Sequence, residues 1–461
     1  MPDSAQFDSL DLKPALLRNI DDIGYTEMTL VQAETLPHLI KGSDVLARAK
    51  TGSGKTAAFG LGLLNKLDVS VFRTQALVLC PTRELADQVA KEIRRLARGI
   101  ANIKVLTLCG GAPLGPQLAS LQHSPHIIVG TPGRVLKHLR KQTVSLEELE
   151  TFVLDEADRM LDMGFADELD AVLEFLPDER QTLLFSATYP ESISAISQRI
   201  QRRPVTVDVT DDEQPAQIVQ SWCSVTRENR NAELVRALRA WGGALNLVFC
   251  NTKVDCAEVT DYLRSQDIAA VALHGDLDQR ERNEVLVRFA NRSATVLVAT
   301  DVAARGLDVD DLDAVFNYEL PKQAETYVHR IGRTGRAGKQ GTAISLVEER
   351  EEWRWQQIET LLPDAFPQHC GIPDARRSAD TLRPTMTTIH INGGRKNKLR
   401  PGDLLGSLTA AGGVPGDSVG SIDLFDIVSY VAVRNPHAKQ ALQQLASRPI
   451  KGKKFRARIR K

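Results

Sequence analysis

Hydrophobic positions along the chain come in short blocks, separated by longer stretches in which apolar residues recur at helical spacing. Up to about residue 207 the apolar blocks are Asp44–Ala47, Ala76–Cys80, Lys104–Leu108, Ile127–Val129, Phe152–Leu154 and Thr182–Phe185. Buried strands that alternate with helices are typical of a parallel sheet covered on both faces. This part of the chain is therefore predicted to be an α/β domain, preceded by helices at Pro14–Asp21 and around Gln32.

The alternation stops at residues 208–215 and then begins again. That segment reads D-V-T-D-D-E-Q-P, and its acidic character and final proline are typical of a hinge linker. The second series of strands is expected at Ser221–Val225, Leu245–Phe249, Ala269–Leu273, Thr295–Ala299, Ala314–Asn317 and Thr342–Leu346. The two halves should share one architecture, although no obvious sequence repeat relates them.

A different pattern follows a segment rich in Pro, Asp and Arg at residues 363–384. The expected order is strand, helix, strand, strand, helix, strand, at Thr388–Ile391, Arg400–Thr409, Val419–Leu424, Ser429–Val433, Pro436–Ala446 and Phe455–Ile459. This is the order of a small α+β, RRM-like RNA-binding domain.

Composition is that of a soluble globular protein, with 42% hydrophobic and 25% charged residues among 461. No apolar run is long enough for a membrane span, and the first ten residues do not resemble a secretion signal. The six cysteines show no C-x-x-C spacing, so we expect reduced core thiols rather than disulfides or zinc. We therefore expect a cytoplasmic protein with no membrane partner.

The net charge of −1 hides a strong asymmetry. Residues 381–461 contain 15 Lys and Arg against 4 Asp and Glu, a balance of +11, whereas the rest of the chain carries 43 against 55, or −12. The final segment, Arg448–Lys461, has eight basic residues and no acidic one, and it alternates its charges with Ile450, Phe455 and Ile459. An acidic body with a basic tail indicates a polyanion as the partner of the tail.

The first stretch that indicates chemistry reads A-K-T-G-S-G-K-T and lies between an apolar strand and a helix. Gly52 and Gly54 let backbone N–H groups turn toward phosphate oxygens, and the positive end of the following helix adds to the attraction. Lys55 can reach the β- and γ-phosphates, and the Thr56 hydroxyl can ligate Mg²⁺. A simple glycine-rich turn would leave the Lys–Thr pair unexplained. The residues expected to bind a nucleotide here are Ala49, Lys50, Thr51, Gly52, Ser53, Gly54, Lys55 and Thr56.

A second motif identifies the reaction. The apolar strand Phe152–Leu154 ends in D-E-A-D, at Asp155–Asp158. Asp155 can hold Mg²⁺ through water, and Glu156 can orient and deprotonate the attacking water, as hydrolysis of a phosphoanhydride requires. Any one of these acids could instead cap a helix, but the group as a whole, downstream of a phosphate loop, favours a nucleotide hydrolase.

These two motifs together resemble the DEAD-box family of ATP-dependent RNA helicases. The resemblance implies two RecA-like parallel-sheet domains in tandem, with ATP and Mg²⁺ as cofactors and RNA as partner. It extends across Phe7–Arg336, and with the tail it covers essentially the whole chain. The expected divisions are an adenine-reading segment at 1–35, RecA-like domains at 36–208 and 217–365, linkers at 209–216 and 366–384, and the RRM-like domain at 385–461.

The resemblance also assigns residues in the first domain. Gln32 matches the family's adenine-reading glutamine, and Phe7 matches the aromatic residue that stacks on the base. Ser186, Ala187 and Thr188 match the motif that couples the nucleotide site to strand separation, and Asp158 and His329 are placed with them. The matches to RNA-contacting motifs in this domain are Pro81, Thr82, Arg83, Gly110, Gly111, Thr131, Pro132, Gly133 and Arg134.

In the second domain the matching strings are V-F-C-N-T, H-G-D, T-D-V-A-A-R-G-L-D and H-R-I-G-R-T-G-R. By resemblance Asp308 contacts the ATP ribose, while Arg333 and Arg336 are arginine fingers that reach the γ-phosphate. Hydrolysis should then be slow until the two domains close around ATP and RNA, because such a finger contributes roughly 10³–10⁵ in rate. The residues expected to touch RNA here are Thr252, Gly275, Arg282 and Thr300.

The tail lacks the usual aromatic signature of RNA-recognition domains. Its third strand reads S-Y-V-A-V and its first reads T-I-H-I-N-G-G, so RNA is not expected to stack on the sheet in the usual way. The basic segments are better candidates for a hairpin-binding surface: Arg395, Lys396, Lys398, Arg400, Lys451, Lys453, Lys454, Arg456 and Arg458. The tail resembles that of a bacterial subgroup of the family, which implies a hairpin of large-subunit ribosomal RNA as target and a role in large-subunit assembly.

Three functions are compatible with parts of this motif set. The leading hypothesis is an RNA-dependent ATPase, expected to be a monomer, that unwinds short duplexes beside a hairpin held by the tail. An ATP-gated RNA clamp with little unwinding would use the same motifs, so the sequence does not separate the two. A DNA translocase is disfavoured by D-E-A-D together with Gln32 and by the RRM-like tail.

Overall fold

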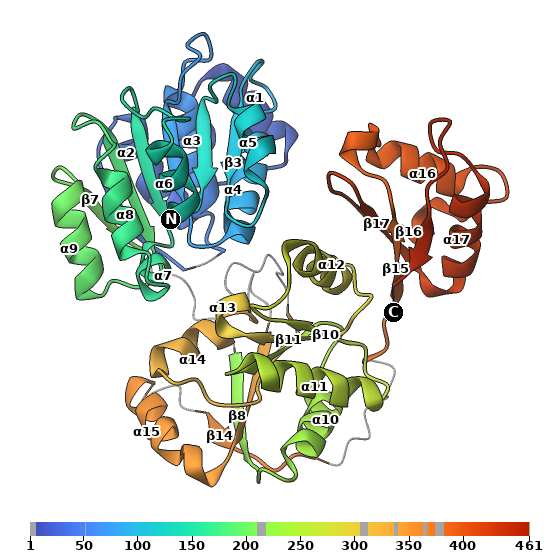
Figure 1. The fold of residues 1–461 in the computed structure, drawn as a ribbon. Helices are drawn as coiled ribbons and strands as arrows, with labels where there is room; N and C mark the ends of the chain where they lie inside the picture. Colours follow the sequence, from blue (N-terminus) through green and yellow to red (C-terminus); the bar gives the residue numbers. More distant parts are fainter. Residues whose placement is uncertain are drawn as a thin grey trace. The chain divides into compact units, whose positions relative to one another are not determined.

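The computed structural model describes residues 6–50, 52–209, 218–304, 312–335, 340–362, 367–373 and 382–460. The described residues form two compact units, whose elements are labelled in Figure 1. Those up to residue 209 make up the first unit, and those from residue 218 onward make up the second. Residues 210–216 of the expected linker 209–216 and part of the linker 366–384 lie outside the described residues.

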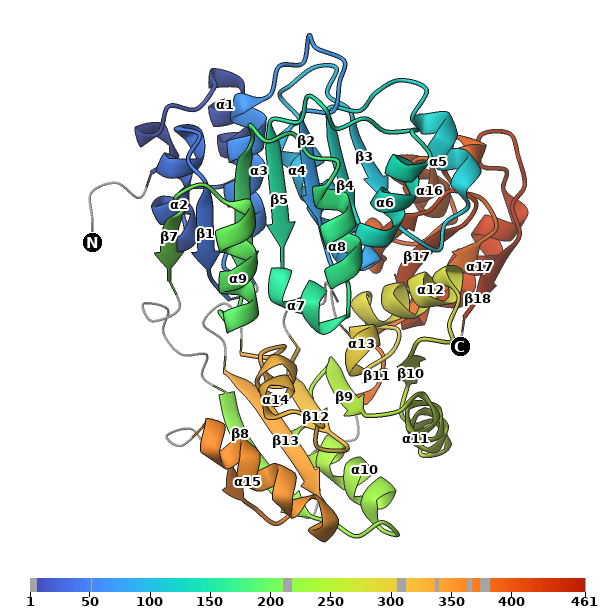
Figure 2. The ribbon, with the colours of Figure 1, turned by 60° about the vertical axis from the view of Figure 1, so that its left-hand side comes forward.

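The first unit is built on a seven-stranded sheet with strand order β3-β4-β2-β5-β6-β1-β7. Every pairing in it is parallel, so the strand arrows point to one edge (Figure 2). The strands are β1 (Val45–Arg48), β2 (Ala76–Leu79), β3 (Val105–Leu108), β4 (Ile127–Gly130), β5 (Thr151–Asp155), β6 (Gln181–Ser186) and β7 (Val205–Asp208). The sequence pattern correctly located all of these except β7, whose short V-T-V-D run adjoins the acidic segment taken as a linker.

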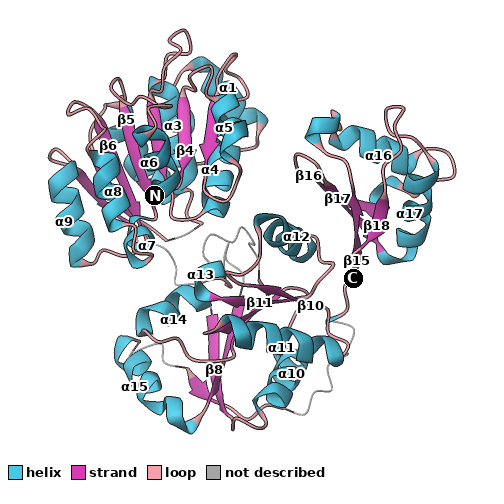
Figure 3. Ribbon diagram, viewed as in Figure 1, coloured by secondary structure: helices cyan, strands magenta, loops and turns pink. Residues whose placement is uncertain are grey.

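Helices cover both faces of this sheet (Figure 3), because successive residues of each strand point to opposite faces. Val153 belongs to the core under α1–α4, whereas Phe152 and Leu154 belong to the core under α6, α8 and α9. The helical segments are η1 (Phe7–Ser9), α1 (Pro14–Asp22), α2 (Leu30–Ile40), α3 (Lys55–Lys66), α4 (Arg83–Leu96), α5 (Leu114–Ser120), α6 (Pro132–Arg140), α7 (Ala157–Asp162), α8 (Ala166–Leu173) and α9 (Glu191–Ile200).

The second unit contains a sheet with the same arrangement, in the order β10-β11-β9-β12-β13-β8-β14. Each strand takes the place of the strand numbered seven lower in the first sheet, and all of these pairings are parallel. The strands are β8 (Ile218–Ser224), β9 (Asn246–Cys250), β10 (Ala270–Leu273), β11 (Val296–Thr300), β12 (Ala314–Asn317), β13 (Gly341–Val347) and β14 (Gln368–His369). The sequence pattern did not find β14, because a strand of two residues carries no periodicity.

The helical segments of this part are α10 (Arg230–Trp241), α11 (Lys253–Ser265), α12 (Gln279–Ala290), α13 (Asp301–Ala304), α14 (Ala324–Ile331), η2 (Glu349–Glu351) and α15 (Glu352–Leu361). Throughout the described ranges of the chain, no helix combines the length and the apolar character that crossing a membrane requires.

The tail is a four-stranded antiparallel sheet in the order β16-β17-β15-β18, with helices on one face. Its elements are β15 (Met386–Ile391), η4 (Arg395–Asn397), α16 (Pro401–Thr409), η5 (Gly416–Ser418), β16 (Val419–Leu424), β17 (Ser429–Arg434), η6 (Asn435–His437), α17 (Ala438–Ser447) and β18 (Ala457–Ile459). Alternate residues such as Ile389 and Val431 pack with Leu404 and Leu445 in the core. The predicted fold class, two parallel α/β sheets followed by a small α+β domain, is confirmed.

Candidate functional site

The sequence-predicted site residues of the first unit lie at one edge of its sheet, where the parallel strands end. The phosphate-loop sequence follows β1, D-E-A-D begins at the end of β5, and S-A-T begins at the end of β6. These three strands are neighbours in the sheet. The fold therefore brings together motifs that are far apart in sequence, and the carboxyl edge of an open parallel sheet is where such folds bind ligands.

The phosphate loop is held in shape by its own backbone and by Lys55. Gly52 and Gly54 adopt left-handed conformations at φ 89° and 97°, which a residue with a side chain rarely takes. The Lys55 ammonium is buried and donates a hydrogen bond to the Ala49 carbonyl at 2.7 Å, so it lies inside the loop. Ser53 donates to the Lys50 carbonyl at 2.9 Å, and Thr56 lies in the first turn of α3. Thr51 lies outside the described residues.

Asp155 and Glu156 occupy the strained junction between β5 and α7. Asp155 is 2% exposed, and burial raises the pKa of its carboxyl to about 7, although Lys55 acts in the opposite direction. Glu156 adopts a left-handed backbone at φ 55°, a conformation that costs about 1–3 kcal/mol and is typical of active sites. Its Oε2 accepts a hydrogen bond from Arg159 Nη1 at 2.8 Å, and both side chains are buried.

The residues around Asp155 fit a hard divalent cation. Oδ1 of Asp155 is buried and makes no hydrogen bond to any described residue. A buried carboxylate oxygen without a donor is unfavourable unless a ligand satisfies it. Carboxylate and hydroxyl oxygens are also the donors that Mg²⁺ takes in phosphate sites, so Asp155 and Thr56 have suitable chemistry for the expected ion.

Gln32 contacts the phosphate loop, whereas Phe7 packs on Tyr25. The Gln32 amide accepts from Thr29 N at 2.9 Å and donates to the Gly54 carbonyl at 3.2 Å, which ties it to the phosphate loop. An amide keeps further donor and acceptor capacity after two bonds. Phe7 is 4% exposed, and its ring stacks on Tyr25 at 6.3 Å. Adenine recognition by Gln32 and base stacking by Phe7 stay predictions.

The coupling motif contacts the last acid of D-E-A-D directly. Thr188 donates to Asp158 Oδ2 from its backbone N–H at 2.9 Å and from its hydroxyl at 2.7 Å, and Ser186 Oγ donates to the Thr188 carbonyl at 2.7 Å. Burial alone would raise the pKa of Asp158, but these bonds, with Arg159 and Lys55 nearby, lower it below its usual value. The loop that contains Ala187 is therefore bonded to the nucleotide-binding edge.

The candidate RNA-contacting residues of the first unit follow β2, β3 and β4, which form the other half of the same edge. Thr82 caps α4, and the Arg83 guanidinium lies over two small residues: a Cβ on Gly111 would meet Arg83 Nη1 at 1.6 Å. Thr131 is the N-cap residue of α6, whose first residues are Pro132 and Gly133. Pro81 lies in the bend before Thr82. Arg134 donates to Gln117 and to the Ala112 carbonyl at 2.6 and 2.9 Å. The other glycine of the pair, Gly110, also lies against Arg83.

The second sheet repeats this placement. Thr252 follows β9 and caps α11, Gly275 follows β10 with open space around it, and Thr300 ends β11. These strands are the counterparts of β2, β3 and β4. Arg282 on α12 donates to the Ala303 carbonyl at 3.5 Å. His329 lies in the last turn of α14, and Arg333, 5% exposed, follows that helix, while Asp308 and Arg336 lie outside the described residues.

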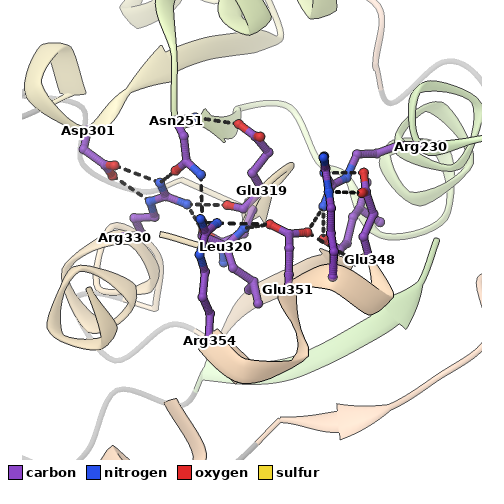
Figure 4. Close-up of polar contacts among 12 residues, drawn as sticks. Arg230, Asn251, Asp301, Glu319, Leu320, Arg330, Glu348, Glu351 and Arg354 are labelled. Carbon is purple, nitrogen blue, oxygen red and sulfur yellow. Dashed lines mark hydrogen bonds and ion pairs between the residues drawn. The ribbon is translucent and has the colours of Figure 1, made fainter. Parts of the chain in front are cut away.

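Sequence reasoning missed the residue that connects the motifs of the second sheet. Arg330, only 1% exposed, donates to both carboxylate oxygens of Asp301 at 2.6 and 2.8 Å and to Asn251 Oδ1 at 2.8 Å. Arg330 also donates to the Glu319 carbonyl at 2.7 Å, and Asn251 donates to the Glu319 carboxylate and to the Leu320 carbonyl, each at 2.9 Å (Figure 4). The three strings V-F-C-N-T, T-D-V-A-A and H-R-I-G-R are thus held by one guanidinium. The H-R pair was the available signal, since buried arginines need partners.

The tail places its two basic segments side by side. Lys451 Nζ donates to the Lys398 carbonyl at 2.9 Å and pairs with Asp403 at 2.8 Å, while β18 pairs with β15. Arg395 and Lys396 lie on η4, and Arg400 precedes α16. The tail residues proposed for RNA are all exposed: Arg395, Lys396, Lys398, Arg400, Lys451, Lys453, Lys454, Arg456 and Arg458.

The sheet face where RNA-recognition domains usually stack bases is covered by α12 of the same unit. Tyr430, fully buried, packs with Val287 and donates to Glu284 Oε2 at 3.4 Å. Thr388 donates to Asn291 Oδ1 at 3.0 Å. His390 is 3% exposed and meets the Tyr430 ring edge-on. The sequence argument against stacking relied on missing aromatics, whereas the structure provides a steric reason.

Comparison with known proteins agrees with this geometry. The chain matches the family models "DEAD/DEAH box helicase" over residues 29–196, "Helicase conserved C-terminal domain" over 230–338 and "DbpA RNA binding domain" over 388–459. It is 53% identical over 450 residues to the ATP-dependent RNA helicase DbpA of Escherichia coli, covering 98% of both chains. It is 34% identical to DbpA of Bacillus subtilis, again covering 98% of both chains.

Among solved structures, Saccharomyces cerevisiae Dbp5 bound to RNA and ADP BeF3 superposes with a TM-score of 0.73 at 31% identity, covering 80% of this chain and 96% of that one. The bacterial subgroup that the tail resembles is that of DbpA. The motifs, the paired sheets and the tail therefore lead to one conclusion: the chain belongs to the DEAD-box family of ATP-dependent RNA helicases.

Proposed function

We propose that this helicase hydrolyses ATP in response to RNA, unwinds short duplexes locally, and is directed by its tail to a hairpin of large-subunit ribosomal RNA during subunit assembly. The observation that carries the proposal is the tail: its two basic segments are exposed and adjacent, while its sheet face is covered by α12. RNA would therefore meet the loops and edge of the tail.

In the first unit, Lys55 would bind the β- and γ-phosphates, and Glu156 would deprotonate the attacking water. Arg159 would keep the Glu156 carboxylate oriented through their 2.8 Å contact. Mg²⁺, held by Thr56 and through water by Asp155, would neutralise phosphate charge when bound. Gln32 and Phe7 would select adenine, and Asp308 would contact the ribose.

Bound RNA would lie along the strand-end residues of both sheets, contacting phosphates and 2′-hydroxyls rather than bases. Arg83 with Gly110 and Gly111, Thr131–Arg134, and Thr252, Gly275, Arg282 and Thr300 are the groups proposed to make these contacts. Small residues suit this role because they let the RNA backbone approach the protein backbone closely.

Arg333 and Arg336 would complete the ATP site when ATP and RNA bind together, so that hydrolysis reports closure of the two domains. The solved relative Dbp5 carries RNA together with ADP BeF3, in which the fluoride group stands for the γ-phosphoryl. If RNA tightens ATP binding, ATP must tighten RNA binding by the same factor.

The test is ATPase stimulation by a panel of large-subunit ribosomal RNA fragments, with unrelated hairpins of equal length as controls. One hairpin fragment should half-saturate the enzyme at a far lower concentration than the rest. Replacing Lys453 and Lys454 by Ala should raise that concentration roughly three- to tenfold, since phosphate contacts are lost. The matched variant Lys439→Ala, an exposed charge on α17 of the same domain, should leave it unchanged. Equal stimulation by all fragments would contradict the ribosomal target.

An ATP-gated clamp remains the alternative, because it uses the same motifs. A strand-displacement assay beside a tethered hairpin separates the two: ATP-dependent retention of RNA without displacement would favour the clamp.

We also propose a cytoplasmic monomer, since six cysteines without a disulfide framework suit a reducing compartment. Sedimentation of the RNA-free protein checks its oligomeric state.

A further inference from the structure

Two cysteines far apart in sequence meet at the outer edge of the second sheet. Cys223 lies in β8, and Cys370 follows β14 directly. Their sulfur atoms are 3.4 Å apart, within hydrogen-bonding distance for thiols. We propose that Cys223 and Cys370 form a reversible disulfide when the protein meets a peroxide, so that the pair is an oxidation site that clamps the end of the second sheet.

Strand register explains why the two thiols meet. β14 pairs with β8 in parallel, with Gln368 opposite Ser221 and His369 opposite Trp222, so Cys370 is the next residue along, beside Cys223. Cys370 N–H donates to the Trp222 carbonyl at 2.9 Å, which continues the ladder. Neighbouring strands lie about 4.7–4.9 Å apart, within the roughly 4.4–6.8 Å between Cα atoms that a disulfide spans.

The bond requires only a small closure. The sulfur atoms would approach from 3.4 Å to the disulfide length of about 2.05 Å, a change that side-chain rotation and a slight shift of a two-residue edge strand can provide. β14 is at the end of the sheet and pairs only with β8 in the strand order, so it has room to adjust.

The two thiols differ in solvent exposure, and this difference indicates which of them reacts with the peroxide first. Cys370 is partly exposed, whereas Cys223 is 2% exposed, and burial together with its bond to Cys370 raises the pKa of the Cys223 thiol well above its usual value. Cys370, as thiolate, would attack one peroxide oxygen; the other oxygen leaves as hydroxide, giving a sulfenic acid. The Cys223 sulfur then attacks the Cys370 sulfur, the S–S bond forms, and water leaves. In total two thiols lose two electrons and peroxide becomes two waters.

The disulfide would act on a short segment at the edge of the sheet. Residues 367–373 contact the rest of the unit through the β14 ladder, through the edge-on contact of His369 with Trp222, and through Arg236, which donates to the Ile372 carbonyl at 3.1 Å. Pro367 is also buried, and Cys370 and Ile372 pack against the core of the unit. A disulfide would join this segment, which precedes the tail in sequence, covalently to the strand that follows the interdomain linker.

The experiment treats the reduced full chain with hydrogen peroxide and counts thiols after denaturation. We expect the count to fall from six to four, and peptide mapping to show Cys223 linked to Cys370 within one chain. Hydrogen exchange at residues 367–373 should slow in the oxidised form, and a dithiol reductant should restore both the count and the exchange rate.

Two single variants make the result decisive. Cys370→Ser is at a partly exposed position and should keep all five of its thiols under the same treatment. Cys109→Ser, the control, should still lose two. The proposal is overturned if wild type keeps six thiols, if the linked peptides contain another pair of cysteines, or if the bond joins two chains.

Discussion

The two large sheets of this helicase have the same strand order, but the side chains at the carboxyl ends of corresponding strands differ. In the first sheet, the ends of β5, β6 and β1 carry D-E-A-D, S-A-T and the phosphate loop. In the second, the ends of β12, β13 and β8 lead into a network of buried ion pairs. There Arg230, 3% exposed, pairs with Glu348 at 2.8 Å and with Glu351, and donates to the Leu346 carbonyl at 2.9 Å.

The difference lies in whether the buried carboxylates find donors within the chain. Glu351 also accepts from Leu320 N–H at 3.1 Å, so the second sheet meets its buried acids with its own donors. In the first sheet, Asp155 keeps a buried oxygen with no hydrogen bond to a described residue. One topology therefore supports either a ligand site or a structural network, and the donors that the chain supplies decide which.

The largest effect is expected from a substitution at the end of β5 in the first sheet. Glu156→Gln keeps the size and the Arg159 contact of the side chain but removes its capacity to accept a proton. RNA-stimulated turnover should fall roughly 10²–10⁴-fold, the usual contribution of a positioned base. Steady-state phosphate release measures it. ATP and RNA binding, followed by fluorescence titration, should be largely retained, and a variant with normal turnover would remove Glu156 as the base.

The next largest effect is expected from a substitution in the ion-pair network of the second sheet. Arg230→Met removes the cation from two buried glutamates, and breaking such a pair typically costs about 3–5 kcal/mol of unfolding free energy. Denaturant titration measures it. Arg199→Met, which breaks a half-exposed pair with Asp170, is the matched control and should cost at most about 1 kcal/mol. If Arg230→Met were stable but lost ATPase activity, the second network would be catalytic and the contrast between the sheets would be wrong.

These two sites also show what sequence could and could not predict. The strands were readable because parallel strands buried on both faces are continuous apolar runs. The position of Asp155 and Glu156 at the end of a buried strand could be predicted because D-E-A-D directly follows such a run. The role of Arg230 could not be predicted, because an isolated arginine on a helix looks solvated, and its partners lie 118 and 121 residues away. The packing of α12 against Tyr430 could not be predicted either. No local sequence pattern specifies which other element a given face of a strand contacts.

A smaller effect is expected at two glycines proposed to contact RNA, Gly111 after β3 and Gly275 after β10. Gly111 has φ +74°, and an added Cβ would collide with Arg83, whereas Gly275 has open space around it. Gly111→Ala should cost about 1–2 kcal/mol for the left-handed backbone and weaken RNA stimulation by displacing Arg83. Gly275→Ala should leave unfolding unchanged.

RNA stimulation of the ATPase, measured in both variants, tests whether RNA approaches the two glycines. A loss in Gly275→Ala without a loss of stability would show that RNA approaches the backbone there. Equal stability of the two variants would contradict the left-handed strain assigned to Gly111.

The last prediction concerns a feature found in the second unit, the packing of the tail against α12. His390 lies at this contact, and burial, with Arg458, Arg460 and Arg280 nearby, lowers its pKa to about 4. The unfolded chain, with a His pKa of about 6.5, binds the proton more readily. The stability that neutral His390 provides is therefore complete above pH about 6.5 and is lost as pH falls toward 4. Thermal unfolding between these pH values measures it. His390→Gln keeps a polar group without the titration, so its unfolding should depend less on pH; an unchanged pH dependence would mean that acid acts elsewhere in the tail.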